Sequence, residues 1–181
     1  MKIAIPKPTL HSFKPISCRS ATKLNVATTC IRSTRFATTT ATPNPPLELK
    51  TTADPPKDFI NTNQFFKNRK VLLIGMVGAF TGVCDNQLPP FAEKYEEFKQ
   101  RGIDEIAVVS VNDPPVLKAF QKHLNIPTDK MILLADFDGA FTRSLGMEVD
   151  LSIAKLGKRS KRYAMLVDNG KIVKQLVEEK P

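Results

Sequence analysis

Cys84 is the residue of this chain best placed to carry out chemistry. The sequence contains three cysteines, Cys18, Cys30 and Cys84, and this odd number without metal-ligand spacing indicates neither a disulfide framework nor a zinc site. Cys84 follows a glycine-containing loop between an apolar run at 71–74 and a helical repeat. A thiol at a helix N-terminus meets unpaired N–H groups and the positive end of the helix dipole, which favour the reactive thiolate. A small buried core residue is the alternative interpretation.

The elements expected to position Cys84 alternate between strands and helices. Buried-strand runs are expected at 71–74, 106–111 and 131–134, and helices at 88–102, 114–124 and 138–145. Residues 146–161 form a polar, basic connection. The tripeptide Asp168-Asn169-Gly170 predicts a type I′ turn between strands at 163–167 and 172–177. This order predicts an α/β fold with a mixed central sheet flanked by helices and a C-terminal hairpin, as in the thioredoxin fold.

The N-terminal third of the chain has a different composition. Residues 1–47 contain seven Lys or Arg and no Asp or Glu, in a chain whose net charge is +9. They are rich in Ser and Thr and lack an apolar run long enough for a membrane span. This composition predicts a transit peptide to the chloroplast, or alternatively to the mitochondrion, because Arg32 and Arg35 precede Phe36. With the proline-rich stretch that follows, we expect residues 1–57 to be a disordered leader and linker, and residues 58–181 to be the folded domain.

The loop before Cys84 resembles the active-site loop of type II peroxiredoxins, the peroxiredoxin 5-like group that includes plant organellar members. Residues 78–84, Gly-Ala-Phe-Thr-Gly-Val-Cys, are similar to the family pattern Pro-x-x-x-Thr-x-x-Cys. The resemblance runs from Thr62 to the last residue, and further matches follow in the correct order at 110–114, 136–139, 144–146 and 159–163. Several separate matches are more specific than one short motif. The resemblance implies a thioredoxin-like fold.

The resemblance also implies an activity and a set of site residues. The chain would be a thiol-dependent peroxidase that reduces hydrogen peroxide and alkyl hydroperoxides through a sulfenic acid at Cys84. Thr81 would place its hydroxyl against the thiolate and the peroxide, and Arg162 would supply positive charge that also stabilises the breaking O–O bond. Outside this family pattern, Thr81 is interpreted as a loop hydroxyl bonded to backbone, and Arg162 as part of a solvated basic loop. No cofactor or metal is expected.

The reductant is expected to come from outside the chain. Plant relatives often place a second cysteine where this sequence has Val108. Removal of the transit peptide would also remove Cys18 and Cys30, so no internal partner for Cys84 remains. We therefore expect resolution by glutaredoxin with glutathione or by thioredoxin. We expect a monomer or weak homodimer, and no nucleic acid or membrane partner, since the basic stretch 155–162 carries no recognisable binding motif.

Three departures from the family pattern support an alternative function. Val77 replaces the loop proline, and Asp85 puts a carboxylate next to Cys84 that opposes thiolate formation unless it points to solvent or caps the helix. The sequence stops at Pro181, where relatives continue into a further helix, so we expect a truncated final helix. The alternative is a catalytically weak, peroxiredoxin-like protein that senses redox state or binds partners. A disulfide oxidoreductase is disfavoured because the chain has no Cys-x-x-Cys pair.

Overall fold

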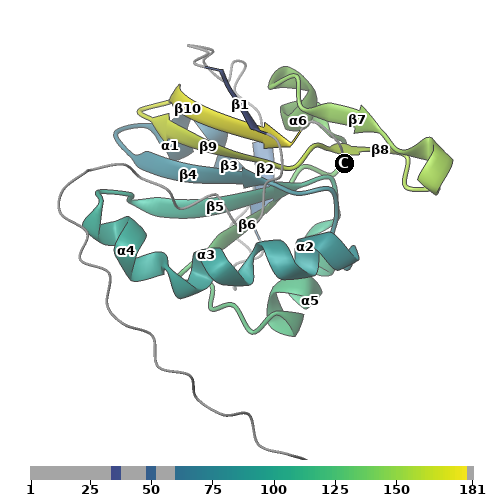
Figure 1. Ribbon diagram of the computed structural model, residues 1–181, viewed down its shortest axis with the longest axis horizontal. Coiled ribbons are helices and arrows are strands. Elements are labelled where there is room, and N and C mark those ends of the chain that lie inside the picture. The colour runs from purple at the N-terminus through teal and green to yellow at the C-terminus, as the bar shows by residue number, and fades with distance from the viewer. Residues whose placement is uncertain (1–33, 38–47, 52–59, 179–181) are drawn as a thin grey trace, which may run out of the picture.

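A central mixed sheet with helices on both faces forms the protein (Figure 1). The computed structural model describes residues 34–37, 48–51 and 60–178. The strands are β1 Thr34–Ala37, β2 Glu48–Thr51, β3 Ile60–Asn61, β4 Lys70–Gly75, β5 Glu105–Ser110, β6 Ile132–Ala135, β7 Glu148–Asp150, β8 Lys158–Ser160, β9 Tyr163–Asp168 and β10 Lys171–Glu178. The helices are α1 Thr62–Phe66, α2 Gly82–Gln87, α3 Pro89–Glu93, α4 Tyr95–Gln100, α5 Pro114–His123 and α6 Ala140–Ser144, with a 3₁₀ turn η1 at Ser152–Ala154.

The predicted mixed sheet is confirmed. The strand order is β1-β10-β9-β4-β5-β6-β2-β3, in which β4, β5 and β6 are parallel and β9 is antiparallel to β4. Side chains alternate between the two faces, so Ile74 and Val108 pack in the core on the side of α2 and α5, whereas Leu73 and Ala107 pack with α1 and α6. Burial on both faces explains why these strands are continuous apolar runs rather than alternating ones.

The long helix expected over 88–102 is instead the short helices α3 and α4, preceded by α2. Pro89 and Pro90 occupy the first positions of α3. Proline lacks the N–H that would continue a helix from α2, so the chain can only begin a new one there. Lys94, with φ −92° and ψ 14°, separates α3 from α4. The predicted apolar spacing nevertheless holds, because Leu88 is buried and the rings of Phe91 and Phe98 stack 6.1 Å apart.

The C-terminal hairpin matches its prediction. Asp168 pairs with Lys171 across a two-residue loop, in which Asn169 and Gly170 have φ of 47° and 77°. Positive φ at both central residues is what a type I′ turn requires. The hairpin sets β9 beside β4 and leaves β10 to pair with β1.

The polar connection expected over 146–161 contains further structure. Strands β7 and β8 pair antiparallel, with Val149 opposite Arg159, and form a two-stranded arm that projects from the main sheet and ends at η1 (Figure 1). A short exposed ribbon needs no apolar face, so its sequence carries no alternation that would have revealed it. Leu151 and Leu156 pack against the core on the side of α2 and anchor the arm.

Two strands lie within the segment interpreted as leader and linker. β1 pairs with β10, and β2 pairs with β6 and β3. The expectation that the folded chain begins at residue 58, with everything before it disordered, therefore does not hold for 34–37 and 48–51. The rest of residues 1–57, and the predicted truncation after Pro181, lie outside the described residues. Among the helices that the structure describes, none has the length and apolar character needed to cross a membrane.

Candidate active site

Cys84 lies in the first turn of α2, directly after the loop that leaves β4. Thr81 is the N-cap residue, and its carbonyl oxygen accepts the N–H groups of Cys84 at 2.8 Å and Asp85 at 3.3 Å. The predicted placement of Cys84 between a buried strand and a helix start is thus confirmed. Since β4 is a parallel strand, this loop lies at the edge of the sheet where the strands β4, β5 and β6 end.

The Cys84 side chain is fully buried, with 0% of its surface exposed. It packs in the same core cluster as Met76 and Leu88. Two neighbours along the chain are exposed instead, Phe80 at 52% and Val83 at 55%. The Cys84 side chain is therefore not accessible to solvent in this structure.

Thr81 shapes the loop with its hydroxyl. Its Oγ1 donates to the carbonyl oxygen of Gly78 at 2.8 Å, and a hydroxyl has only one hydrogen to donate. In this arrangement Thr81 can accept a hydrogen bond but cannot donate one to a thiolate. The loop is also anchored to the end of β5, because Asn112 Oδ1 accepts from the Ala79 N–H at 3.0 Å and from Ser110 Oγ at 2.8 Å.

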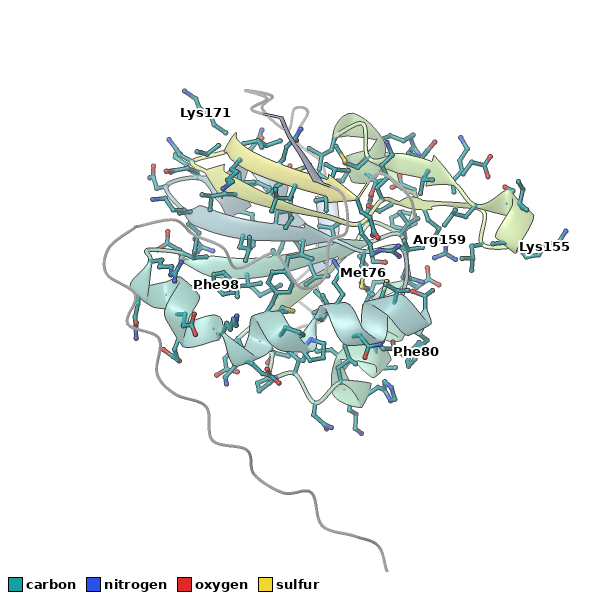
Figure 2. All side chains as sticks on the ribbon, in the orientation of Figure 1. Met76, Phe80, Phe98, Lys155, Arg159 and Lys171 are labelled. Atoms are coloured by element: carbon teal, nitrogen blue, oxygen red, sulfur yellow. The ribbon has the colours of Figure 1, made fainter. Side chains whose placement is uncertain are left out.

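Phe80, immediately before Thr81, has a strained backbone. Its φ is 59°, in the left-handed region that a bulky residue rarely adopts. Its ring, at the start of α2 in Figure 2, lies 5.2 Å from that of Phe120 and 5.6 Å from that of His123. Strain of this kind collects at functional sites and persists only where neighbouring contacts hold it.

Arg162 directly precedes β9, and its side chain is paired with Glu178. The register pairs Tyr163 with Gly75, and Tyr163 packs in the core opposite that of Cys84. By alternation, Arg162 lies on the face of Cys84. Its Nε forms an ion pair with Glu178 Oε2, and the two side chains are only 13% and 22% exposed. Within residues 60–178, no described hydrogen bond or ion pair joins Arg162 to Cys84 or Thr81.

Arg159 lies on β8 of the two-stranded arm, and its guanidinium is held by backbone carbonyls (Figure 2). Its Nη1 donates to the Val111 carbonyl at 2.7 Å and its Nε to the Leu156 carbonyl at 2.8 Å. A Cβ built on Gly78 would lie 3.5 Å from Arg159 Nη1. Sequence reasoning grouped Arg159 with a solvated basic stretch, because one arginine among five neighbouring cations has no local signal that distinguishes it.

The two departures next to Cys84 take defined places in the structure. Val77 is 4% exposed and packs in the core cluster of Cys84. Asp85 lies in the first turn of α2, where its charge suits the helix dipole. Its Oδ1 is buried and has no hydrogen-bond partner among the described residues, and the same holds for Gln87 Oε1. Buried polar atoms without partners are rare in native proteins and destabilising.

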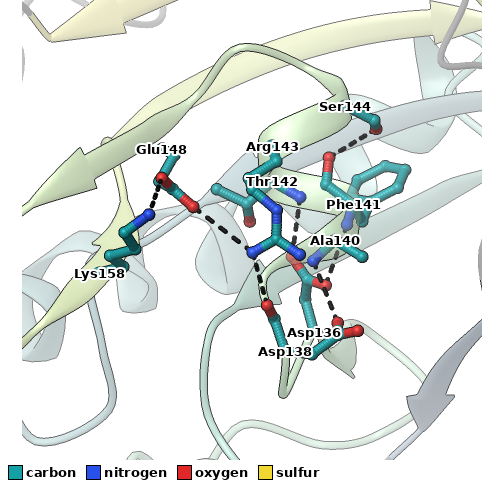
Figure 3. A network of polar contacts seen from close by, with 9 residues as sticks. All are labelled: Asp136, Asp138, Ala140, Phe141, Thr142, Arg143, Ser144, Glu148 and Lys158. Atoms are coloured by element: carbon teal, nitrogen blue, oxygen red, sulfur yellow. Dashed lines mark hydrogen bonds and ion pairs between the residues drawn. The ribbon is translucent and has the colours of Figure 1, made fainter.

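At the strand end after β6, side-chain carboxylates accept the backbone N–H groups that begin α6 (Figure 3). Asp136 is 2% exposed, and its two carboxylate oxygens accept the N–H groups of Phe141 at 3.1 Å and Thr142 at 2.8 Å. Asp138 Oδ1 accepts the Ala140 N–H at 3.0 Å. These bonds satisfy the donors at the start of α6 and fix the loop to the sheet.

Tyr163 connects the two strand ends. A Cβ on Gly75 would lie 2.1 Å from Tyr163 Cε1, so only glycine permits the ring to lie against the end of β4. Burial, together with the negative charge of Asp136, raises the pKa of the Tyr163 phenol far above its ordinary value. The phenol therefore stays protonated and neutral. Within the described residues, no group of three or more His, Cys, Asp or Glu side chains could hold a metal ion.

A thioredoxin-like sheet with a buried cysteine in the first turn after a parallel strand defines a redoxin-type domain. The redoxin family model matches residues 37–181, which is most of the chain. This match begins upstream of residue 58 and includes the segment that contains β2.

Individual relatives identify the kind of redoxin more specifically than the family model does. Peroxiredoxin-2C of Oryza sativa subsp. japonica is 47% identical over 113 residues, which cover 61% of this chain and 68% of that protein. The mitochondrial peroxiredoxin-2F of Arabidopsis thaliana is 42% identical over 120 residues, which cover 66% of this chain and 59% of that protein. The chain therefore belongs to the peroxiredoxins of the redoxin family, as its resemblance to the plant type II group predicted. The match to the Arabidopsis relative spans less than two thirds of that relative's length.

Solved structures agree with this assignment. Reduced Prx3 of Vibrio vulnificus in complex with H₂O₂ superposes with a TM-score of 0.72 at 34% identity, over 77% of this chain and 89% of that one. Peroxiredoxin 5 of Alvinella pompejana gives a TM-score of 0.69 at 35% identity, over 78% of this chain and 88% of that one. The predicted thioredoxin-like fold is thus confirmed.

Proposed function

We propose that the protein is a thiol peroxidase that reduces hydrogen peroxide and alkyl hydroperoxides, with Cys84 as the nucleophile. The observation that carries this proposal is the position of Cys84 in the first turn of α2, under the loop that leaves β4, in a chain of the peroxiredoxin family. The start of a helix is the kind of position at which reactive cysteines are found.

The reaction oxidises the sulfur by two electrons. The Cys84 thiolate attacks one peroxide oxygen, an S–O bond forms and the O–O bond breaks. The departing oxygen takes up a proton and leaves as water or an alcohol, and Cys84 is left as the sulfenic acid. Negative charge develops along the O–O bond as it breaks, so hydrogen-bond donors around these oxygens lower the activation barrier of the attack.

Thr81 and Arg162 are proposed as these donors. For Thr81 to donate to the thiolate or the peroxide, its hydroxyl must turn away from the Gly78 carbonyl that it now contacts. Arg162 uses its Nε for Glu178, which leaves the Nη donors of its planar fork for the reacting oxygens. Glu178 is then the residue that orients the arginine.

The burial of Cys84 adds a conformational step. Because its side chain is 0% exposed, the peroxide must enter while the loop at 76–81 is displaced. The strained φ of Phe80 and the exposed Val83 make this segment the natural one to move. We therefore propose that loop opening precedes the chemical step.

An outside thiol completes the cycle in this proposal. A thiolate attacks the sulfenic sulfur, water leaves and a mixed disulfide forms; a second thiol then releases Cys84 and carries away the disulfide. Within the described residues Cys84 is the free cysteine, and Val108 occupies the place of the second cysteine of plant relatives. We propose glutaredoxin with glutathione, or thioredoxin, as the reductant of a monomer or weak homodimer.

Trapping the sulfenic acid tests the proposal. The reduced full chain is mixed with a slight excess of hydrogen peroxide, and dimedone adducts are located by mass spectrometry. Cys84 should be modified much faster than free cysteine. The Cys18→Ser/Cys30→Ser variant should behave like the parent chain, and Cys84→Ser should give no adduct in this region. A rate no greater than that of free cysteine would overturn the enzyme assignment.

Turnover assays test the reductant. Peroxide consumption is followed with glutaredoxin plus glutathione, with thioredoxin plus its reductase, and with neither. At least one complete system should sustain many turnovers of the Cys18→Ser/Cys30→Ser variant. Sulfenic acid formation without turnover in either system would exclude these reductants while leaving the nucleophile in place.

A catalytically weak, redox-sensing or partner-binding protein is the second candidate. The complete burial of Cys84 and the pairing of Arg162 with Glu178 favour it. It predicts slow oxidation of Cys84 together with a stable complex that the oxidised protein forms and the reduced protein does not.

We also propose import into an organelle, with the chloroplast favoured over the mitochondrion. The acid-free, Ser- and Thr-rich residues 1–47 support import, and the name of the mitochondrial relative from Arabidopsis supports the second compartment. Incubation of the radiolabelled full chain with isolated chloroplasts and mitochondria distinguishes the two by which organelle protects a shortened product from protease.

A further inference from the structure

A pocket of about 180 Å³ lies outside the Cys84 site, between the loops that follow β5 and β6 and the β7–β8 arm. Its walls include Val111, Phe137, Thr142, Arg143, Lys158 and Arg159. None of these residues was assigned a role in the peroxide chemistry. One of its lining residues, Arg159, also lies near Gly78 of the Cys84 loop, since a Cβ built on that glycine would be 3.5 Å from Arg159 Nη1.

The topology explains why a pocket forms here. Helix α5 leaves β5 toward the face of Cys84, where Leu117 joins that core, whereas α6 leaves β6 toward the opposite face, where Phe141 joins the other core. When the helices after neighbouring parallel strands diverge in this way, a crevice opens at the carboxyl ends of the strands, and open α/β sheets bind ligands there. Val111 follows β5 and Phe137 follows β6, so the pocket occupies this crevice.

The pocket is lined by the cations Arg143, Lys158 and Arg159 and by the carboxylates Asp138 and Glu148, so three positive charges face two negative ones. Glu148 pairs with Arg143 at 3.5 Å and with Lys158 at 3.2 Å (Figure 3). Arg159 has no carboxylate partner within residues 60–178. Its Nε and Nη1 bond to backbone carbonyls, which hold the guanidinium in place and leave further N–H donors free. A positioned guanidinium binds a carboxylate well.

Thr142 adds a second, independent observation. It lines the pocket and is 0% exposed, and its Oγ1 is buried without a hydrogen-bond partner in the described part of the chain. Leaving a buried hydroxyl unpaired is destabilising, so a ligand oxygen that accepts a hydrogen bond from Thr142 would remove this cost and bind more tightly. Val111 and the 58% exposed ring of Phe137 provide apolar surface beside these polar groups.

We propose that this pocket binds the carboxylate of a small aliphatic acid, with Arg159 as the main binding residue and Thr142 as a second one. The carboxylate can belong to a free organic acid or to glutathione. The proposal does not depend on Cys84 being peroxidatic, because it concerns binding at a separate pocket.

Titrations with the reduced full chain test it. Succinate represents a free organic acid, S-methylglutathione represents glutathione without a reactive thiol, and succinamide is the neutral control. Changes in NMR chemical shifts and isothermal titration calorimetry should show saturable one-to-one binding of at least one carboxylate and no binding of succinamide. Whichever of succinate and S-methylglutathione binds more tightly identifies the source of the bound carboxylate. Absence of saturable binding by both carboxylates would overturn the proposal.

Variants locate the binding. Arg159→Gln should weaken it by about tenfold or more. Lys155→Gln removes a cation at the far tip of the same arm (Figure 2) and should leave the affinity unchanged. Thr142→Val keeps the shape and charge and should weaken binding a few-fold without loss of thermal stability, so it decides the matter if Arg159→Gln does not fold. Equal affinities in the parent chain, Arg159→Gln and Thr142→Val would refute this pocket as the site.

Discussion

The strand ends after β4 and after β6, which lie on either side of β5, differ in how the following helix begins. After β6, Asp136 accepts two N–H groups at the start of α6 and Asp138 accepts a third. After β4, the start of α2 has no side-chain cap at Thr81, and Asp85 Oδ1 is buried without a partner in the described residues. Both segments join a parallel strand to a short helix, so the contrast does not follow from topology.

The difference separates stability from reactivity. Satisfied buried polar groups stabilise a loop in one geometry. The segment before Cys84 has no side-chain cap at Thr81 and contains the strained Phe80, so we expect it to be easier to displace. Substitutions at the β6 end should therefore change the free energy of unfolding, while substitutions at the β4 end should change the oxidation of Cys84.

Asp136→Ala should lower the free energy of unfolding by about 4 kcal/mol, since two buried N–H donors lose their acceptor at about 1–3 kcal/mol each. Asp136→Asn retains one acceptor oxygen and should lose roughly half as much. Denaturant unfolding measures both. Asp138→Ala is the exposed control, with a loss of about 1 kcal/mol. Under native conditions the folded Asp136→Asn protein should oxidise at Cys84 at the parent rate, and a large decrease would mean that the two ends are not separate.

Thr81→Val should change the rate of Cys84 oxidation much more than the free energy of unfolding. It removes a hydroxyl proposed to contact the reacting oxygens, so the rate of Cys84 oxidation should fall by about 10²-fold. The lost bond from Oγ1 to the Gly78 carbonyl should lower stability by only about 1 kcal/mol. Stopped-flow peroxide kinetics and denaturant unfolding measure the two quantities, and Thr81→Ser should restore most of the rate. An unchanged rate would remove Thr81 from the proposed mechanism.

Gly75→Ala tests the link between the two ends. The new Cβ would lie 2.1 Å from the ring of Tyr163, so the ring or the end of β4 must shift, at about 1–3 kcal/mol in unfolding free energy. Gly82→Ala is the matched control, because nothing lies within 4 Å of its Cβ. The control should be neutral or stabilising by about 0.5–1 kcal/mol. Equal effects of both substitutions would show that the Tyr163 contact does not constrain this strand end.

The sequence was sufficient for the core of the fold. Strands β4, β5 and β6 are buried on both faces and therefore appear as plain apolar runs, and the Asn-Gly turn sets the hairpin without help from the rest of the chain. The division of the 88–102 helix was also visible in principle, since Pro89 and Pro90 are strong local breakers that the apolar spacing masked. The arm at 148–160 was not predictable, because exposed strands need no apolar pattern.

The site was predictable as far as backbone position, and no further. Cys84 and Thr81 lie on one short segment, so a motif can locate them. Whether Arg159 or Arg162 reaches the loop depends on the β7–β8 pairing and on the carboxylate of Glu178, which lies on another strand. Such contacts are set by tertiary register, which no local pattern encodes. The strands at 34–37 and 48–51 were missed for the same reason, since pairing with β10 and β6 outweighs a composition typical of a linker.

The smallest predicted effect concerns Asp85. Asp85 directly follows Cys84, whose sulfur must become anionic, so Asp85→Asn should speed sulfenic acid formation at pH 7 by about two- to fivefold, as expected for charges at a partly exposed site. The same carboxylate interacts favourably with the start of α2, so stability should fall by at most about 1 kcal/mol. Glu93→Gln makes the same charge change on the exposed end of α3 and should alter neither quantity. If Asp85→Asn slows oxidation instead, Asp85 supports the reactive geometry of the loop, and the unpaired oxygen at this strand end serves the chemistry rather than opposing it.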